Sequence, residues 1–151
     1  TAAGDALELG RLWVLPAKEP TPTGEPTARF GASIELLGAQ RAGTTLTLYW
    51  RTNAALTAEY TVFVHLLDAN GQIVGQMDGL PLDNRYPTWA WRPGQIIEDR
   101  REVAATGVDP STIHTIAVGV YHPASDERLT AVDANGVQLP NNAHLLPWGQ
   151  P

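Results

Sequence analysis

Almost every apolar stretch of this chain is short, alternates apolar with polar residues, and ends at glycine, proline, asparagine or aspartate. In residues 44–51, for example, Leu46, Leu48 and Trp50 are separated by threonine and tyrosine. Successive side chains of a β-strand point to opposite faces, so a period of two indicates strands that bury one face. The apolar spacing of three to four residues that marks an amphipathic helix is missing. The pattern therefore predicts an all-β chain.

The alternating stretches define nine candidate strands with turn residues between them. These are residues 7–15, 30–37, 44–51, 60–67, 72–78, 95–103, 115–121, 128–132 and 137–139. Two Asp-Ala-Asn-Gly segments, at residues 68–71 and 133–136, predict tight hairpin turns because asparagine and glycine both tolerate positive φ. Eight or nine short strands are typical of an antiparallel β-sandwich, either immunoglobulin-like or of the jelly-roll type. This is the fold that we predict.

Two of the predicted strands are expected to occupy different positions in a sheet, one central and one at an edge. Residues 60–67 are apolar on both faces, which indicates a central strand. Residues 95–103 carry charge on both faces, which is typical of a protected edge strand. Asp99 and Arg101 lie two residues apart and share a strand face, so we expect them to form an ion pair at this sheet edge.

The chain of 151 residues is long enough for one domain with its own hydrophobic core. We assign residues 1–140 to the β-sandwich domain and residues 141–151 to an irregular C-terminal tail. Single helical turns are expected at residues 54–59 and 108–113. Because the chain begins at Thr1 and shows no signal peptide, we expect it to be part of a longer protein.

The composition argues against several classes of partner and site. The formal net charge is −6 and Lys18 is the only lysine, so the clustered basic charge that a nucleic-acid backbone requires is missing. No apolar run approaches the roughly 18 residues that span a bilayer, and we expect no direct membrane insertion by this chain. Cysteine is absent from the sequence, which excludes disulfides and thiolate metal sites.

The sequence contains no recognisable motif for catalysis or metal binding. It has no Gly-x-Ser-x-Gly element, and its four histidines lack the spacing that places two ligands on one face. His65, between Phe63 and Leu67 on one strand face, is expected to be structural. Asp126 and Glu127 lie in a predicted turn and are expected to be solvated. The two Asp-Ala-Asn-Gly turns do not fit a calcium-binding loop, so we predict no catalytic residue, no metal, no cofactor and no enzymatic activity.

The long loop at residues 79–94 is the segment most typical of a ligand site. Aromatic faces with neighbouring polar groups suit stacking on sugar rings. The other interpretation, which we prefer, is that Trp89 and Trp91 fold back and cap the open end of the sandwich. The candidate ligand-binding residues are Asp83, Asn84, Tyr86, Trp89, Trp91 and Arg92.

Several segments of the chain resemble a known bacterial module. They are YTVFVHLLDANGQIV from Tyr60, Trp-Arg-Pro-Gly from Trp91, Asp-Arg from Asp99, and Val-Gly-Val-Tyr-His-Pro from Val118. The resemblance covers about residues 7–139. The module is a β-sandwich at the C-terminal end of large multi-spanning membrane proteins, many of them glycosyltransferases of the lipid-linked-sugar, protein-mannosyltransferase-like type.

This resemblance implies an extracytoplasmic location in the cell envelope, with the domain tethered through membrane helices of a parent chain. It supplies no catalytic residue, because the transferase chemistry would belong to the membrane portion. The resulting hypothesis is a non-catalytic accessory domain that positions glycan or packs against the membrane portion of its own parent chain. The alternatives are a carbohydrate-binding module that uses the aromatic residues of the 79–94 loop, and a protein–protein interaction module that uses an exposed sheet edge.

Overall fold

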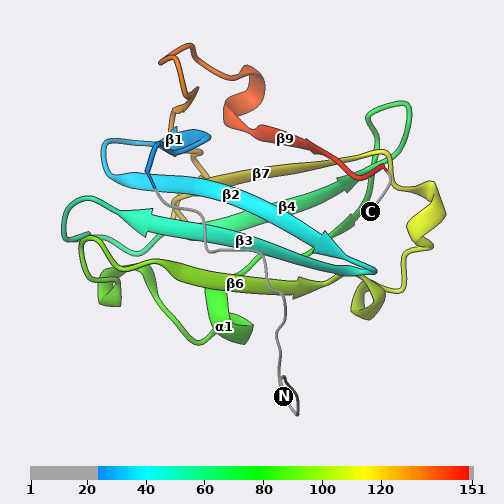
Figure 1. The fold of residues 1–151 in the computed structure, drawn as a ribbon, viewed down its shortest axis with the longest axis horizontal. Coiled ribbons are helices and arrows are strands. Elements are labelled where there is room, and N and C mark those ends of the chain that lie inside the picture. The colour runs from blue at the N-terminus through cyan, green and yellow to red at the C-terminus, as the bar shows by residue number, and fades with distance from the viewer. Residues whose placement is uncertain (1–23, 150–151) are drawn as a thin grey trace, which may run out of the picture.

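The computed structural model of the chain describes residues 24–149. Two antiparallel sheets stack face to face, so the predicted all-β sandwich is confirmed (Figure 1). The strand predicted at residues 7–15 lies outside the described residues. Nine strands occur in the described part: β1 (Ala28–Phe30), β2 (Ile34–Ala42), β3 (Thr45–Thr52), β4 (Thr61–Leu67), β5 (Ile73–Gln76), β6 (Ile97–Glu102), β7 (Thr115–Tyr121), β8 (Ala131–Asp133) and β9 (His144–Pro147).

Five short helical segments lie in the connections between these strands. They are α1 (Pro81–Asn84) and the 3-10 turns η1 (Thr88–Ala90), η2 (Val103–Thr106), η3 (Pro110–Thr112) and η4 (Pro140–Asn142). The helical turn predicted at residues 108–113 is confirmed by η3, where the Asp109 carboxylate accepts from the backbone N–H of Ser111 at 3.0 Å. The turn predicted at residues 54–59 is wrong, because this segment contains no helix.

The strand order places the predicted central and edge strands as expected. One sheet has the order β6-β3-β2-β1-β8 and the other has the order β5-β4-β7-β9. Strand β4 is therefore central: it pairs with β7 along its whole length and with β5 over residues 65–67, which confirms the prediction for residues 60–67. Strand β6 pairs with β3 alone and forms the edge of the five-stranded sheet.

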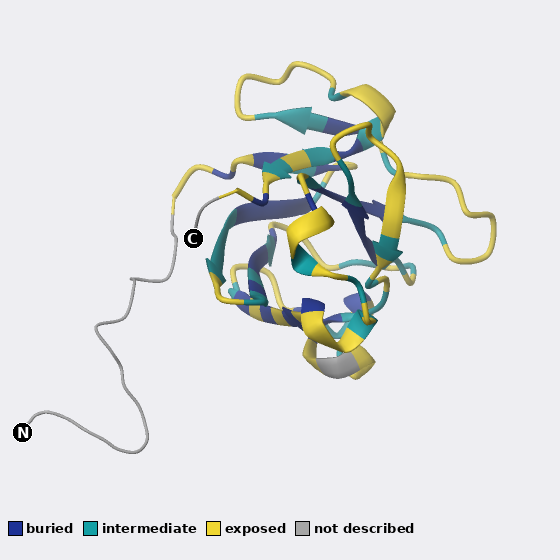
Figure 2. Cartoon of the chain, turned by 90° about the vertical axis from the view of Figure 1, so that its right-hand side faces the viewer, coloured by how far each residue is buried: buried dark blue, intermediate teal, exposed yellow. Residues whose placement is uncertain are grey.

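The core consists of apolar side chains from the inner faces of both sheets. Val62 and Val64 on β4 and Val118 and Val120 on β7 have 0% exposure. They meet the larger side chains of the opposite sheet, among them Trp50 on β3. Figure 2 shows these buried strands enclosed by exposed connecting loops. The period-two pattern therefore identified the inward-facing residues correctly.

The strand predicted at residues 30–37 is two strands joined by a tight turn. Gly31 has φ +63°, and the chain reverses so that Phe30 pairs with Ile34. The alternation continues in phase across this turn, and sequence periodicity alone does not reveal the break. Strand β2 then runs to Ala42, beyond the predicted strand end at residue 37.

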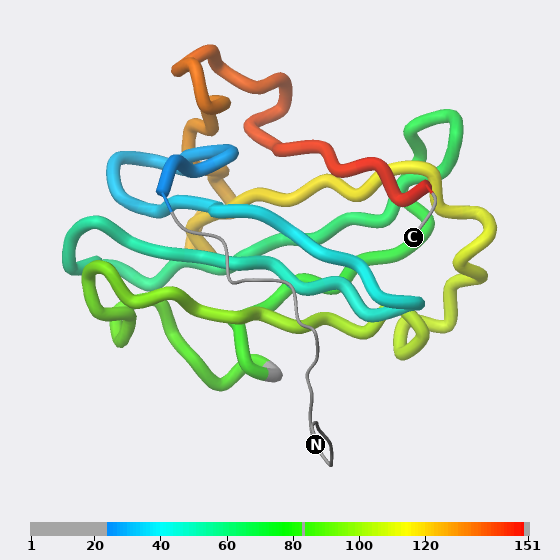
Figure 3. Tube along the Cα trace, viewed as in Figure 1, coloured from blue at the N-terminus to red at the C-terminus, as the bar shows by residue number. Residues whose placement is uncertain are grey.

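The C-terminal boundary also requires correction. Residues 137–139 form no strand and contribute an isolated bridge between Val132 and Gln138. The tail predicted to be irregular, residues 141–151, contains β9, which pairs with β7 and packs Leu146 on the core. Figure 3 shows β9 running alongside β7. A four-residue strand that ends in proline is too short for the alternation to be recognised in the sequence.

Candidate functional site

The loop at residues 79–94 does not present its aromatic rings as one surface. Trp91 is 3% exposed and its ring centroid lies 6.3 Å from that of Trp50 in the core. Its indole N–H donates to the backbone carbonyl of Tyr86 at 3.3 Å. Trp89, two residues earlier on η1, is 61% exposed. The cap interpretation therefore agrees with the burial of Trp91, whose ring has no free face for a ligand, and is wrong for Trp89.

The other candidate residues of this loop mainly hold the loop itself. The Tyr86 hydroxyl donates to Gln95 Oε1 at 2.8 Å, and this glutamine oxygen also accepts from the backbone N–H of Arg92 at 3.1 Å. Asn84 Oδ1 accepts from the backbone N–H of Leu80 at 2.8 Å. The Arg92 side chain belongs to an exposed residue, and the side chain of Asp83 lies outside the described part of the chain. Trp89 is thus the candidate aromatic residue that offers a free ring.

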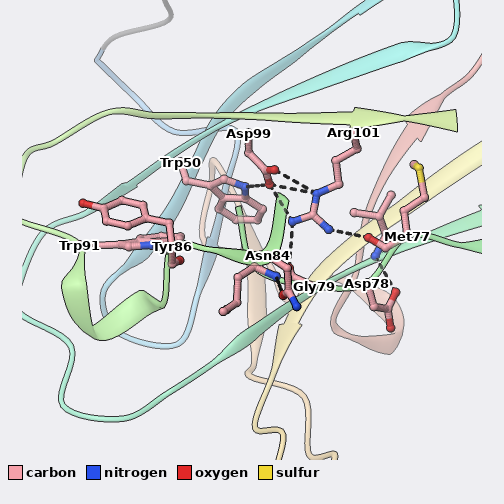
Figure 4. Close-up of polar contacts among 11 residues, drawn as sticks. Trp50, Met77, Asp78, Gly79, Asn84, Tyr86, Trp91, Asp99 and Arg101 are labelled. Carbon is pink, nitrogen blue, oxygen red and sulfur yellow. Dashed lines mark hydrogen bonds and ion pairs between the residues drawn. The ribbon is translucent and has the colours of Figure 1, made fainter. Parts of the chain in front are cut away.

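A buried ion pair anchors the start of the same loop. Arg101 Nη2 lies 2.9 Å from Asp99 Oδ2, which confirms the predicted pair, although both side chains are buried inside the sandwich. The indole N–H of Trp50 donates to the Asp99 carboxylate at 3.0 Å. The guanidinium also donates to the carbonyls of Met77 and Gly79, and so connects β6 with the segment after β5 (Figure 4). These charges are satisfied within the protein, as buried charges require.

A different group of side chains converges on the outer face of the four-stranded sheet. They line a depression of about 190 Å³, which we call the outer-face depression. In the β4–β7 pairing, Phe63 lies opposite Gly119 and Thr61 lies opposite Tyr121, so these positions share the face turned away from the core. The lining residues are Phe63, His65, Asp78, Tyr121, Asp126 and Arg128.

Phe63 is the floor of the outer-face depression. The guanidinium carbon of Arg128 lies 4.2 Å from the centroid of the Phe63 ring, and the imidazole of His65 lies 4.8 Å from it. The ring also covers Gly119, where an added Cβ would come within 2.2 Å of Phe63 Cζ. Glycine is therefore required opposite Phe63 for the ring to lie flat on the sheet.

Charged and polar groups surround this aromatic floor. Asp78 Oδ1 accepts from the backbone N–H of Val64 at 3.1 Å and lies 3.6 Å from His65 Nε2. Arg128 Nη1 donates to the backbone carbonyl of Asn141 at 2.8 Å, which fixes the guanidinium above the ring. The pKa of Tyr121 is raised by burial, and the Asp78 and Asp126 carboxylates raise it further. Within the described residues, the side-chain carboxylate of Asp126 makes no hydrogen bond and no ion pair.

Most residues of the outer-face depression were not predicted as site residues from the sequence. One signal did point to them: residues 60–67 are apolar on both faces. We explained this pattern by a central position of the strand in its sheet. Asp126 was placed in a solvated turn, and its positive φ of 62° belongs to that turn. His65, expected to be structural, is buried in the wall of the depression. The sequence separation between Phe63 and Arg128 hid their contact.

Comparison of the chain with protein-family models, with curated proteins and with solved structures finds no match. Among residues 24–149, no three histidine, cysteine or carboxylate groups lie close enough together to hold a metal ion. The described part of the chain also contains no helix that is long and apolar enough to cross a membrane.

Proposed function

We propose that this chain is a non-catalytic accessory domain of a bacterial cell-envelope membrane protein and that it binds glycan in the outer-face depression. The observation that carries this proposal is the convergence of the half-buried Tyr121 ring with two carboxylates and a guanidinium in one depression, over the buried ring of Phe63. Pyranose rings present apolar C–H faces together with hydroxyl groups. An aromatic ring packs on the former, and carboxylates and arginine exchange hydrogen bonds with the latter.

The arrangement of the depression favours recognition because its parts are held before any ligand arrives. Arg128 is fixed by Phe63 and by the carbonyl of Asn141, and Asp78 is fixed by the backbone of β4. A site built on strands loses little conformational entropy on binding. Tyr121, which is half-buried beside these groups, supplies the ring that a sugar would contact.

The envelope location rests on the resemblance to modules of membrane-bound glycosyltransferases. In such a parent chain, a glycan-binding domain outside the membrane would hold an acceptor or product near the transferase portion. The net charge of −6 favours glycan over nucleic acid as the partner.

The proposal is tested with the purified domain on an array of neutral, amino and acidic oligosaccharides, followed by isothermal titration of the strongest binder. We expect Tyr121→Ala to weaken binding at least about fivefold, because an aromatic contact contributes about 1 kcal/mol beyond its buried area. Trp89→Ala is the matched control, since it removes an exposed aromatic ring outside the depression. Binding should be unchanged in this variant.

Two results would contradict the proposal. If no oligosaccharide on the array binds to the wild-type domain, glycan recognition is wrong. If Trp89→Ala abolishes binding and Tyr121→Ala does not, the sugar is bound at the 79–94 loop. Circular dichroism and a thermal melt of each variant show that the fold is retained in both cases.

A second candidate function is protein–protein interaction at a sheet edge. Strand β5 pairs with β4 alone, and its residues Ile73 and Val74 are 52% and 36% exposed. An exposed apolar edge strand can add a strand from another chain. This alternative predicts an oligomer in light scattering that Ile73→Lys converts to a monomer.

A further inference from the structure

A second depression adjoins the outer-face depression at Asp78. It has a volume of about 400 Å³ and occupies the space between strand β6 and the segment that follows β5. We call it the edge depression. Its lining residues are Gln76, Met77, Asp78, Gly79, Leu80, Asn84, Asp99, Arg100, Arg101, Glu102, Ala105 and Thr106.

Asp78 is the one residue that lines both depressions, and it lies at the boundary between them. The segment at Asp78 is fixed on one side by β4, because the N–H groups of Met77 and Gly79 donate to the carbonyls of Val64 and Val62 at 2.8 and 2.9 Å. It is fixed on the other side by Arg101, which donates to the carbonyls of Met77 and Gly79. The boundary between the depressions is therefore rigid, and their relative position is set before binding.

The edge depression offers polar groups that the protein does not use. Asn84 Oδ1 accepts from the backbone N–H of Leu80, but its Nδ2 makes no hydrogen bond within the described part of the chain. Gln76 is exposed beside it, and Arg100, also exposed, lies 3.4 Å from a Glu98 carboxylate oxygen through its Nη2. Glu102, in contrast, already accepts from Thr45 Oγ1 at 2.9 Å and from the backbone of Ala104. Uncharged amides together with arginine are suited to hydroxyl groups.

The volumes decide what size of ligand fits. Sites for small molecules usually measure about 300–1,000 Å³. The outer-face depression, at about 190 Å³, is smaller than this range, whereas the adjoining edge depression, at about 400 Å³, lies within it. A single sugar unit would occupy one depression and leave the other empty.

We propose that the ligand of this domain is an extended glycan of several units, which begins in the outer-face depression, crosses Asp78 and continues in the edge depression. This inference rests on the proposed function, because it assigns a second subsite to the same glycan. Asn84 is a specificity-determining residue for the distal units, through a hydrogen bond from its Nδ2 to a sugar hydroxyl.

The test is a titration series with linear oligomers of glucose, mannose and N-acetylglucosamine that contain one to six units. For the sugar that binds, we expect the affinity to rise about tenfold from the single unit to the longer oligomers and then to stay constant. Asn84→Asp should abolish this gain and leave binding of the single unit unchanged. Aspartate keeps Oδ1 for Leu80, tolerates the positive φ of 67° at this position, and lacks the Nδ2 donor.

Asn135→Asp, in the exposed turn after β8, is the control for the added charge. Equal affinity for one unit and for six units overturns the inference while the proposed function stands. A length-dependent gain that survives in Asn84→Asp also overturns the role of Asn84 in the edge depression. If none of the oligomers and nothing on the array binds to the wild type, both the inference and the proposed function are wrong.

Discussion

The loop at residues 79–94 and the outer face of the four-stranded sheet both contain aromatic rings next to charged groups, but these side chains have different roles in the two regions. In the loop, the Trp91 ring is buried in the core, and the Tyr86 hydroxyl is bonded to Gln95. On the sheet face, Asp126 and Arg128 surround an open depression beside the half-buried Tyr121. In the loop the tryptophan and tyrosine are therefore used to hold the fold, whereas the sheet face keeps a carboxylate and a tyrosine ring open to the depression.

This difference shows that hydrogen-bond saturation distinguishes a structural cluster from a binding surface better than composition does. The Asp99–Arg101 pair is the extreme case, because its donors and acceptors are satisfied by Trp50 and by backbone carbonyls. A buried and saturated group can contribute to stability but has no capacity left for a ligand. Substitutions at buried, saturated groups should therefore cost the most stability, and substitutions at groups open to solvent the least.

The largest effect is expected from Arg101→Met. This change leaves the Asp99 carboxylate buried without its cation and two backbone carbonyls without a donor. We expect a loss of about 3–5 kcal/mol in the free energy of unfolding, which urea denaturation measures. Arg100→Met, at the exposed neighbouring position, should change the stability by less than about 0.5 kcal/mol. Equal effects of the two substitutions would show that the Asp99–Arg101 pair does not anchor the loop.

The next effect separates the two tryptophans of the loop. Trp91→Ala removes a ring that is packed in the core and should cost about 3 kcal/mol of stability. Trp89→Ala should cost less than about 0.5 kcal/mol, because its ring is 61% exposed. Chemical denaturation of both variants checks this. A reversed order would mean that the cap has been assigned to the wrong tryptophan.

A smaller effect is expected at the floor of the outer-face depression. In Gly119→Ala the new methyl group would overlap Phe63 Cζ, and the ring must tilt away from the sheet. We expect a loss of about 1–3 kcal/mol, which is typical of overpacking. Phe63→Leu should restore part of this stability when it is combined with Gly119→Ala. Strict additivity in the double-mutant cycle would contradict the contact.

The smallest effect is electrostatic and concerns Tyr121. Its pKa is raised from the ordinary tyrosine value by burial first and then by the Asp78 and Asp126 carboxylates. Asp126→Asn should therefore lower the pKa of Tyr121 and leave the part of the shift that burial causes, as followed by absorbance with Tyr121→Phe as the blank. Since the folded-state pKa is raised, its contribution to stability is present below pH 10 and is lost as the pH rises through that pKa. If the pKa of Tyr121 is unchanged in this variant, the Asp126 carboxylate does not lie close enough to Tyr121 to belong to the depression.

The alternation of apolar residues was sufficient to predict the sandwich and the inward-facing side chains. Val62, Val64, Val118 and Val120 all lie on the inner face, as their period of two requires. The hairpin at Gly31 and strand β9 were not predicted, because one is a turn inside an unbroken pattern and the other is too short to show a pattern.

The candidate site could be predicted only in part, for a physical reason. Local sequence shows which residues lie on a face, but it does not show what covers them. The contact between Phe63 and Arg128 depends on how the segment after β7 returns across the sheet. Trp89 is exposed and Trp91 is buried because of the direction in which the 3-10 turn η1 packs. Long-range packing of this kind is not encoded in periodicity.

The central claim is that the outer face of the four-stranded sheet is the binding surface. Nuclear magnetic resonance of the ¹⁵N-labelled domain, titrated with the strongest glycan from the array, tests this directly. We predict that the amide shifts change along β4 and β7 and at Asp126 and Arg128. Changes confined to Trp89, Arg92 and their neighbours, or spread evenly over the domain, would contradict the account.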